Sequence, residues 1–341
     1  MYSVNNNINH QLKIWLFVLL SLIILIILVG GLTRLTDSGL SITTWELFAG
    51  FLPPLTNDKW IDYFNLYKTI PEYNEQNFNM TLSEFKVIFW WEWGHRQLGR
   101  LIGLAVLLPL IYFTFKDGLW VLKKYGIIFL LICVQGFFGW YMVSSGLVNR
   151  VDVSHYRLSI HLVTAFIILS IVFWYFLELT KIQINKISFK LYFVKFFLFL
   201  LFVQLILGAF VSGMDAGTVY NTWPLMGSSY FPDDSNFNEF LDITFFDNPS
   251  IVQFIHRNLA YLIVIIYMYL SIIVFKSSNK ILRKPILIIG VSLFFQVLLG
   301  VLTILSGVKT IYASLHQINS ILIILSSLYF LYISKYEKKN N

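Results

Sequence analysis

Residues 89–100 read FWWEWGHRQLGR and lie where a long polar segment meets an apolar run. Glu92 and His95 are three residues apart in this stretch, so the two side chains would share one face of a helix. The tryptophans around them are typical of the boundary between lipid and water, where an amphipathic ring is stable. Part of the stretch recurs, because residues 253–257 read QFIHR and also open an apolar run. This recurrence favours a functional site over a simple interfacial anchor.

The composition indicates an integral membrane protein. Hydrophobic residues make up 57% of the chain and charged residues only 13%, about half the charge of an ordinary soluble domain. Eight apolar stretches are long enough to cross a bilayer, which takes roughly 20 residues each. They are residues 13–33, 96–116, 125–144, 157–178, 191–212, 254–275, 285–306 and 312–334. We therefore expect an all-α integral membrane protein with eight transmembrane helices. Cys133 is the only cysteine, which excludes a disulfide within the chain and a thiolate metal cluster.

The charges between these stretches predict the orientation. Lys and Arg gather after the second, fourth and sixth stretches and at the end of the chain: Lys116, Lys123, Lys124, Lys181, Lys186, Lys190, Lys195, Lys276, Lys280, Arg283, Lys284, Lys335, Lys338 and Lys339. Residues 213–252, by contrast, contain six acidic residues and no Lys or Arg. By the positive-inside rule, residues 1–12 and 335–341 are cytoplasmic, and the long loops 34–94 and 213–252 face outward. The net charge of +7 is thus a topology signal that gives no support to a nucleic-acid partner. The absence of a presequence before the first stretch favours a bacterial inner membrane.

The chain contains an internal duplication. Five residues recur at a constant offset of 178: Gly30, Asp37, Gly39, Thr44 and Trp45 match Gly208, Asp215, Gly217, Thr222 and Trp223. Six more recur at an offset of 161: His95, Arg96, Gln135, Gly139, Ser145 and Gly146 match His256, Arg257, Gln296, Gly300, Ser306 and Gly307. His161 matches His316 at an offset of 155. Each repeat has an even number of helices, so both insert the same way up and are related by an axis along the membrane normal. This predicts two pseudo-symmetric four-helix bundles, residues 13–180 and 181–334.

Local patterns predict some details of the loops and of helix packing. Residues 82–89, LSEFKVIF, could form a short amphipathic helix on the membrane surface. The outer loop 213–252 reads as a folded cap, because Trp223-Pro224 ends any helix there. Gly136, Gly139 and Gly300 would permit the close approach of helices or of a flat ligand.

Four histidines lie in the outer third of even-numbered stretches and form two pairs, His95 with His161 and His256 with His316. A single histidine inside a membrane more often bonds a backbone carbonyl across helices. Four of them, paired by a repeat and matched in depth, favour a ligand site. Two imidazoles from facing helices suit the ligation of haem iron from both sides. A zinc or copper ion would want further ligands, and the sequence places none nearby.

Arginines accompany these histidines. Arg96 and Arg257 directly follow His95 and His256, and Arg100 lies one turn beyond Arg96. Guanidinium groups match carboxylates bidentately, so they could hold haem propionates. The competing interpretation is that they only anchor the helices at the interface.

The two halves differ in charge beside the histidine. Glu92 precedes His95 by three residues, whereas Gln253 stands at the matching position before His256. Only the carboxylate can exchange a proton or stabilise developing positive charge. One half therefore reads as reactive and the other as a stable cofactor site, although Glu92 could instead be a solvated loop residue. The halves differ at two further positions. Arg34 is matched by Ser212 in the repeat, and His155 has no histidine counterpart.

Several of these motifs together resemble the haem A synthase family of the alphaproteobacterial and mitochondrial type. They are GGLTRLTDSGLS at 30–41, FLPPL at 51–55, FWWEWGHR at 89–96 and DAGTVYNTWPLM at 215–226, and the resemblance covers residues 13–334. The Bacillus-type branch carries cysteine pairs in its outer loops, and this chain has none. Thiol-dependent steps of that branch are therefore not expected here.

The resemblance implies oxidation of the C8 methyl of haem O to a formyl group, which gives haem A for cytochrome oxidase. It places haem b on His256 and His316, haem O and haem A on His95 and His161, and Glu92 near the reacting methyl. It also implies haem O synthase, cytochrome oxidase assembly factors and an electron-transfer protein as partners, and leaves a homo-oligomer open.

Two other functions compete with this reading. A di-haem b-type electron carrier would place its haems at two depths, whereas all four histidines lie toward one face. A repeat-built transporter would have broken helices and buried charge at the midplane.

Overall fold

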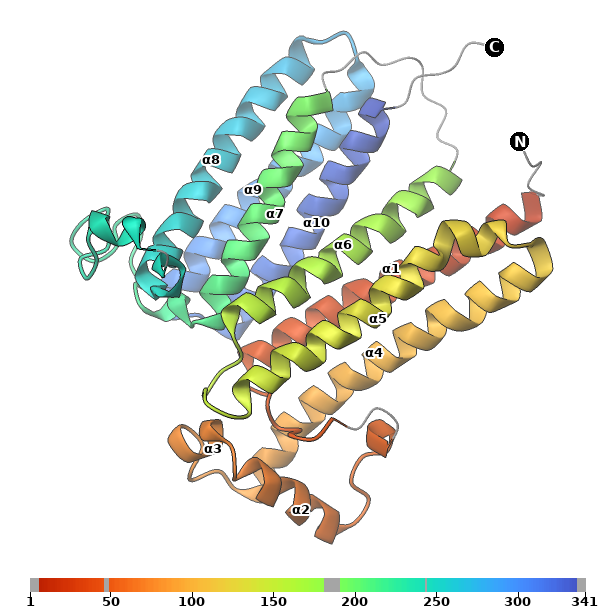
Figure 1. Cartoon of the computed structure of the whole chain (residues 1–341). Helices are drawn as coiled ribbons and strands as arrows, with labels where there is room; N and C mark the ends of the chain where they lie inside the picture. The colour runs from red at the N-terminus through yellow and green to blue at the C-terminus, as the bar shows by residue number, and fades with distance from the viewer. Residues whose placement is uncertain (1–5, 46–48, 181–190, 243, 336–341) are drawn as a thin grey trace. The chain divides into compact units, whose positions relative to one another are not determined.

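The computed structural model describes residues 6–45, 49–180, 191–242 and 244–335. Within these ranges every regular element longer than an isolated bridge is a helix (Figure 1). Eight of the helices are long and apolar enough to cross a membrane, which confirms the predicted number and fold class. They are α1 (Asn6–Leu35), α4 (Leu82–Asp117), α5 (Trp120–Gly146), α6 (His155–Leu179), α7 (Leu191–Gly213), α8 (Pro249–Lys276), α9 (Arg283–Leu305) and α10 (Thr310–Lys335). The predicted basic positions Lys181, Lys186, Lys190, Lys338 and Lys339 lie outside the described residues.

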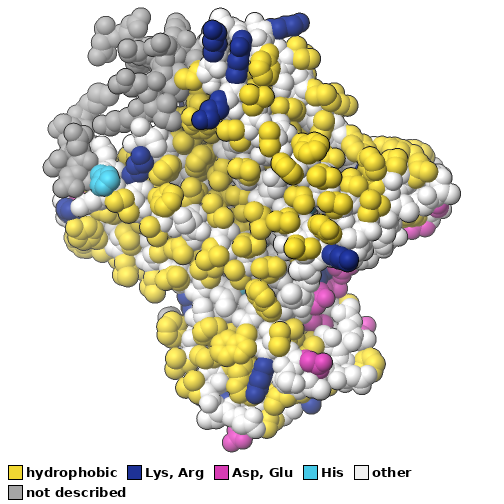
Figure 2. All heavy atoms as spheres, turned by 180° about the vertical axis from the view of Figure 1, so that it is seen from behind, with side chains coloured by type: hydrophobic (Ala, Val, Ile, Leu, Met, Phe, Trp, Pro, Cys, Tyr) yellow, Lys and Arg dark blue, Asp and Glu magenta, His cyan; other side chains and the backbone are white. Residues whose placement is uncertain are grey.

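Large apolar side chains remain exposed along the long helices, as a lipid-facing surface requires. They cover much of the face shown in Figure 2. Leu108, Phe137, Phe199, Ile265 and Phe294 belong to this exposed set. Single exposed apolar residues are ordinary in soluble proteins, but so many along helices of membrane-spanning length indicate that the protein lies in a bilayer.

Helix α4 is much longer than its apolar stretch. The prediction of a separate surface helix over 82–89 is wrong, because Leu82–Asp117 is one continuous helix of 36 residues. A capping box at Thr81 and Glu84 starts it, and this pair satisfies two backbone N–H groups reciprocally. At 1.5 Å per residue the helix is about 54 Å long, well beyond a hydrocarbon core of roughly 30 Å. Its first turns therefore extend into the outer loop.

An aromatic cluster holds those first turns. The loop before α4 forms two helices that the sequence did not predict, α2 (Asn57–Tyr67) and α3 (Pro71–Glu75). Buried residues from this loop, from α4 and from the segment between α5 and α6 form one apolar core: Leu40, Ile42, Trp60, Phe64, Tyr67, Ile70, Phe85, Phe89 and Val153. Trp60 meets Phe89 edge to face, with ring centroids 4.9 Å apart. This geometry is favourable for aromatic pairs and fixes α2 on α4.

The chain divides into two compact units. The amino-terminal unit is Ser21–Ile168, and the carboxy-terminal unit comprises the described residues up to Leu20 and from Leu169 onward. In the carboxy-terminal unit, α9 packs on α10 and α7 on α8. Its outer loop contains the short helices η2 (Ala216–Thr218), η3 (Phe237–Leu241) and η4 (Phe245–Asp247), in agreement with the predicted folded cap. The division into halves at 180/181 and their pseudo-symmetric arrangement stay predictions.

The repeat is visible in the local conformation of the backbone. Asp37 and Asp215 follow α1 and α7, and both adopt the left-handed conformation, with φ of 47° and 49°. Aspartate is one of the few non-glycine residues that tolerate this region. The Asp37 N–H donates to Arg34 O and the Asp215 N–H donates to Ser212 O, at 3.2 and 3.4 Å. The chain therefore leaves the two helices by the same turn.

Candidate functional site

The structure assigns one predicted histidine pair to each unit. His95 on α4 and His161 on α6 lie in the amino-terminal unit, and His256 on α8 and His316 on α10 lie in the carboxy-terminal unit. The members of each pair are close enough for the charge of one to act on the other. All four rings are half-buried. Among the described residues no three His, Cys, Asp or Glu side chains gather as a metal site, so each unit offers a pair of imidazoles and no larger donor set.

A glycine on the preceding membrane helix accommodates each histidine ring. A Cβ atom built on these glycines would lie only 2.7–3.3 Å from the imidazole Cε1. The four glycine–histidine pairs are Gly30 with His95, Gly139 with His161, Gly208 with His256 and Gly300 with His316. Ordinary contact between carbon atoms is 3.5–4.0 Å, so any side chain here would displace the ring. This confirms the expected close approach at Gly139 and Gly300, whereas a Cβ on Gly136 would meet nothing within 4 Å.

Three of the histidines also contact a glutamine from the same neighbouring helix. The Gln135 Nε2 donates to the backbone oxygen of His161 at 2.9 Å and lies 3.2 and 3.3 Å from the two ring nitrogens. Gln204 holds His256 in the same way, at 3.0 Å from its oxygen and 3.1 and 3.3 Å from its ring nitrogens. The sequence comparison of the repeats did not identify Gln204. A Gln four residues before the glycine, seen at 135 and 296, was the signal that could have found it.

Gln296 holds the third of these rings, His316, by a different set of bonds. Its Nε2 lies 3.2 Å from the His316 Nε2, and its backbone oxygen lies 3.0 Å from the His316 Nδ1. Asn319 donates to the Gln296 Oε1 at 2.7 Å and so orients the amide. With Nδ1–H donated to the Gln296 carbonyl, the favoured tautomer has the lone pair on Nε2, where it faces the Gln296 amide; a metal at Nε2 would replace this amide contact.

Glu92 is buried and fully hydrogen-bonded, so the alternative of a solvated loop residue is wrong. Its exposed fraction is 3%. One carboxylate oxygen accepts from the Ser41 hydroxyl and from the Ile42 N–H, both at 2.7 Å. The other accepts from Arg96, at 3.1 Å from Nε and 2.5 Å from Nη2. Glu92 therefore ties α4 to the segment 38–45, which we call the first strap.

Arg96 and Arg257 bind backbone carbonyls in matching positions. Arg96 donates to Ile42 O at 2.9 Å and to Thr44 O at 3.2 Å. Arg257 donates at 3.0 Å to Tyr220 O and Thr222 O, the residues that match 42 and 44 in the repeat. The segment 216–225 is thus a second strap, held over α8 as the first is held over α4. Their expected contact with haem propionates stays a prediction.

The second strap lacks the carboxylate. The Gln253 Nε2 donates to Tyr220 O at 3.2 Å, while the Gln253 Oε1 and the Arg257 Nε have no hydrogen-bond partner among the described residues. The Arg257 Nε therefore lacks the acceptor that Glu92 supplies to the Arg96 Nε. The difference in charge that the sequence predicted thus has a structural counterpart in the way each strap is held.

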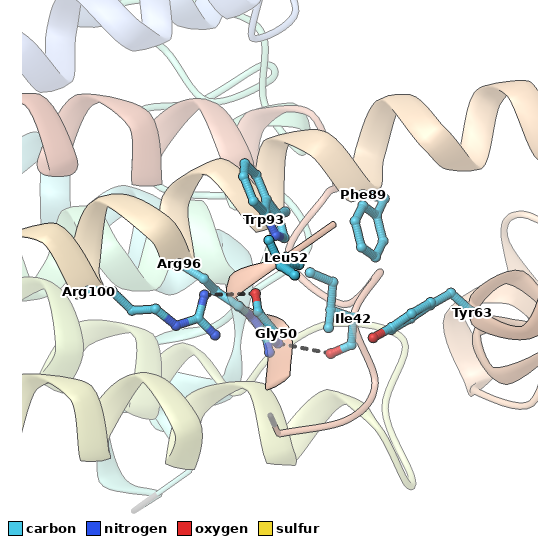
Figure 3. Close-up of a pocket in the computed structure, with 8 residues that line it drawn as sticks. All are labelled: Ile42, Gly50, Leu52, Tyr63, Phe89, Trp93, Arg96 and Arg100. Atoms are coloured by element: carbon cyan, nitrogen blue, oxygen red, sulfur yellow. Dashed lines mark hydrogen bonds between the residues drawn. The ribbon is translucent and has the colours of Figure 1, made fainter. Parts of the chain in front are cut away.

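The remaining predicted arginines also bind outer segments. Arg100 and Gln97 donate to Gly50 O at 3.1 and 2.9 Å, and Figure 3 shows Arg100 and Arg96 along one face of α4 above this segment. Arg34 pairs with Asp37 at 2.7 Å and lies 3.7 Å from Asp152. His155, which begins α6, is buried.

The donor set and the bare glycine surfaces fit haem. Each unit presents two imidazoles, and no Cβ crowds the rings from the neighbouring helix. Bis-histidine ligation of a flat macrocycle needs these two features. A tetrahedral ion would leave half of its coordination positions without a protein ligand.

Comparisons with known proteins agree with this geometry. The family model described as COX15-CtaA, cytochrome oxidase assembly protein, matches residues 13–328. The chain is 50% identical over 337 residues to a protein of Pelagibacter ubique named heme A synthase, which covers 98% of this chain and 99% of that protein. It is 44% identical over 321 residues to a protein of the same name from Rickettsia bellii, covering 91% and 94%. The likeness to the Rickettsia felis protein is 41% over 320 residues.

Proposed function

Since this chain belongs to the COX15-CtaA family of cytochrome oxidase assembly proteins, we propose that it is a haem A synthase of the membrane. Its reaction is the oxidation of the C8 methyl of haem O to a formyl group, which gives haem A for cytochrome oxidase. The di-haem electron carrier is not favoured, because the similar proteins carry the name heme A synthase.

One observation supports the assignment of different haems to the two halves. Both histidine pairs pack against glycines of the neighbouring helices, yet Glu92 stands three residues before His95 and Gln253 three before His256. We assign haem b to His256 and His316, in the half without the carboxylate. Haem O and haem A are assigned to His95 and His161. An iron held between two imidazoles can change its oxidation state without binding a further ligand, which suits an electron-transfer cofactor.

Glu92 takes the electrostatic role in this proposal. The sequence left two roles open, a proton acceptor and a stabiliser of positive charge near the reacting methyl. All four of its hydrogen bonds come from donors, and to take a proton it would have to weaken at least one. A carboxylate fixed in advance by such donors is suited to stabilise charge that develops nearby.

The membrane, the orientation in it and the partners are inferred from the charge pattern and from the substrate. We place the protein in a bacterial inner membrane with both termini in the cytoplasm and both straps on the outer side. Its expected partners are the lipid bilayer, haem O synthase as the source of substrate, cytochrome oxidase assembly factors and a protein that exchanges electrons with haem b. Self-association into a homo-oligomer is compatible with this setting.

Extraction of the bound pigments tests the proposal. The protein is expressed with a haem O synthase in a bacterium that makes no haem A, and the haems are separated by chromatography. We expect protohaem together with haem O or haem A in the wild type. His256→Ala should lower protohaem, and His161→Ala should lower haem O and haem A. Protohaem alone would contradict the synthase, and a full complement of protohaem in His256→Ala would contradict the assignment of haem b.

A further inference from the structure

The chain beyond the first strap runs along α4 in the direction of the bilayer. Glu92 and Arg96 hold the strap itself. Gly50 O accepts from Gln97 at 2.9 Å and from Arg100 at 3.1 Å, and the second of these bonds is drawn in Figure 3. The points of attachment therefore move from Glu92 to Arg100, about 12 Å along the helix axis. Hydropathy places the start of the membrane-crossing stretch near residue 96, so Gly50 lies beside the part of α4 that enters the lipid.

The side of α4 that carries Gln97 faces lipid. Leu101, Leu104 and Leu108 are exposed on this helix and follow Gln97 by four, seven and eleven residues. These spacings place all four side chains on one face. His95, two residues before Gln97, is about 200° away around the helix and belongs to the other side. The chain at Gly50 therefore lies over the lipid-facing stripe of α4, away from the histidine pair.

Residues 50–55, which read GFLPPL, leave their large side chains exposed. Phe51, Leu52 and Leu55 have exposed fractions of 60%, 62% and 73%. The segment carries no charge, and its two prolines have no backbone N–H to leave unsatisfied. The carbonyl of Gly50 is already bonded to α4. Few unpaired backbone groups and several exposed apolar side chains suit the boundary between headgroups and acyl chains, where an unpaired polar group is costly.

We propose that residues 50–55 are a re-entrant segment that inserts Phe51, Leu52 and Leu55 into the outer leaflet of the bilayer. Its partner is lipid, because the segment continues the exposed apolar stripe of α4 and has no charged group of its own. By offering the Gly50 carbonyl it also gives Gln97 and Arg100 a partner at a depth where water is scarce. The insertion anchors the loop that carries the first strap at the membrane. It depends on the membrane-spanning fold and not on the bound pigment.

Nitroxide labels on single cysteines test the insertion. The full chain in a Cys133→Ser background carries Leu52→Cys or Leu55→Cys and is reconstituted in phosphatidylcholine nanodiscs, which leave both faces open to solution. Oxygen dissolves preferentially in lipid and a nickel chelate in water, so their relative effects on the label report its surroundings. Leu104→Cys, on the lipid-facing stripe, and Asp58→Cys, exposed at the start of α2, are the two controls.

We expect the labels at both leucines of the segment to match the Leu104→Cys label, with high access to oxygen and low access to the chelate. Access to the chelate equal to that of the Asp58→Cys label would overturn the proposal. A label shielded from both probes would overturn it as well, because protein, such as a second copy of the chain, would then cover the segment.

A second set of variants tests whether the apolar side chains hold the segment in the lipid. Leu52→Asp combined with Leu55→Asp should move a label at Phe51→Cys from the oxygen-accessible to the chelate-accessible class. Leu52→Met with Leu55→Met is the matched apolar control and should leave that label in lipid. A label that stays in lipid in the aspartate variant would show that the bonds to Gly50 alone hold the segment, against the proposal. None of these readouts uses haem, so their failure leaves the proposed function untouched.

Discussion

Replacing Glu92 by glutamine should loosen the first strap as well as impair the chemistry. The amide keeps the shape of the side chain, but it has one acceptor oxygen where Glu92 uses two. Its NH2 group would face either Arg96 or the donors of Ser41 and Ile42, and each is a donor itself. With the NH2 group toward Arg96, two hydrogen bonds are lost and donors oppose donors. With it toward Ser41 and Ile42, the Ser41 hydroxyl can turn to accept, but the Ile42 N–H loses its acceptor and meets another donor.

The size of the effect follows from the burial of the pair. The Glu92 and Arg96 side chains are 4% and 14% exposed, so the ion pair is largely shielded from water. Removing one partner of a buried pair typically costs about 3–5 kcal/mol. For a chain of 341 residues, with an unfolding entropy of roughly 2.1 cal/mol/K per residue, we expect a fall in Tm of roughly 4–7 °C.

Two variants distinguish the role of Glu92 in holding the first strap from the role of its negative charge. Ser41→Ala removes one strap bond and leaves the carboxylate, so it should lower stability by about 1–2 kcal/mol and keep haem A formation. Gln253→Glu gives the Arg257 Nε the acceptor it lacks and should leave the second strap unchanged or more stable. Thermal unfolding in detergent and chromatography of the extracted haems supply the two readouts.

The results have distinct meanings. We expect Glu92→Gln to unfold at a lower temperature and to accumulate haem O. An unchanged Tm together with loss of haem A would refute the strap argument and leave a purely chemical role. Normal haem A at comparable expression would refute the role in the reaction.

Three further predictions follow from the loops and the glycines. Burial raises the pKa of Glu72 to about 8, helped by Asp152 and Asp37 and opposed by its hydrogen bond from a tyrosine. Because this pKa is above the unfolded value, the contribution to stability is complete below about pH 4.5 and is lost as the pH rises through about 8. Proteolysis of the outer loop should therefore quicken between about pH 5 and 8 in the wild type and not in Glu72→Gln, and equal slopes would contradict this. Gly139→Ala puts a Cβ 3.1 Å from a histidine ring and should reduce retained haem O, whereas Gly136→Ala on the same helix should not; equal retention in the two would show that the glycine contact is unimportant. A cysteine in place of Ser235, in a Cys133→Ser background, should react with an impermeant maleimide in intact cells, and labelling only after lysis would reverse the topology.

Hydropathy and the repeat predicted the helices and the pairing of the histidines, because both depend on patterns within the chain. The start of α4 could not be predicted this way. Residues 82–95 are mixed in polarity, and their helix is stabilised by burial of Phe85 and Phe89 against α2. The partners of Glu92 were also hidden, because Ser41 and Ile42 lie about 50 positions earlier in the chain. The carbonyl partners of Arg96 and Arg257 on the straps were hidden for the same reason, and the contact of these arginines with haem propionates stays a prediction.

The unbroken length of α4 has a mechanical consequence. The aromatic cluster at Phe85 and the ligand at His95 are about 15 Å apart on one rod, and the only proline of the helix, Pro109, comes after both. With no proline between them, the rod has no built-in hinge there. A tilt of about 5° imposed at the cluster would move the His95 backbone by roughly 1 Å, which is enough to change a coordination bond. A force applied to the segment before α4 would therefore also move His95, the proposed iron ligand.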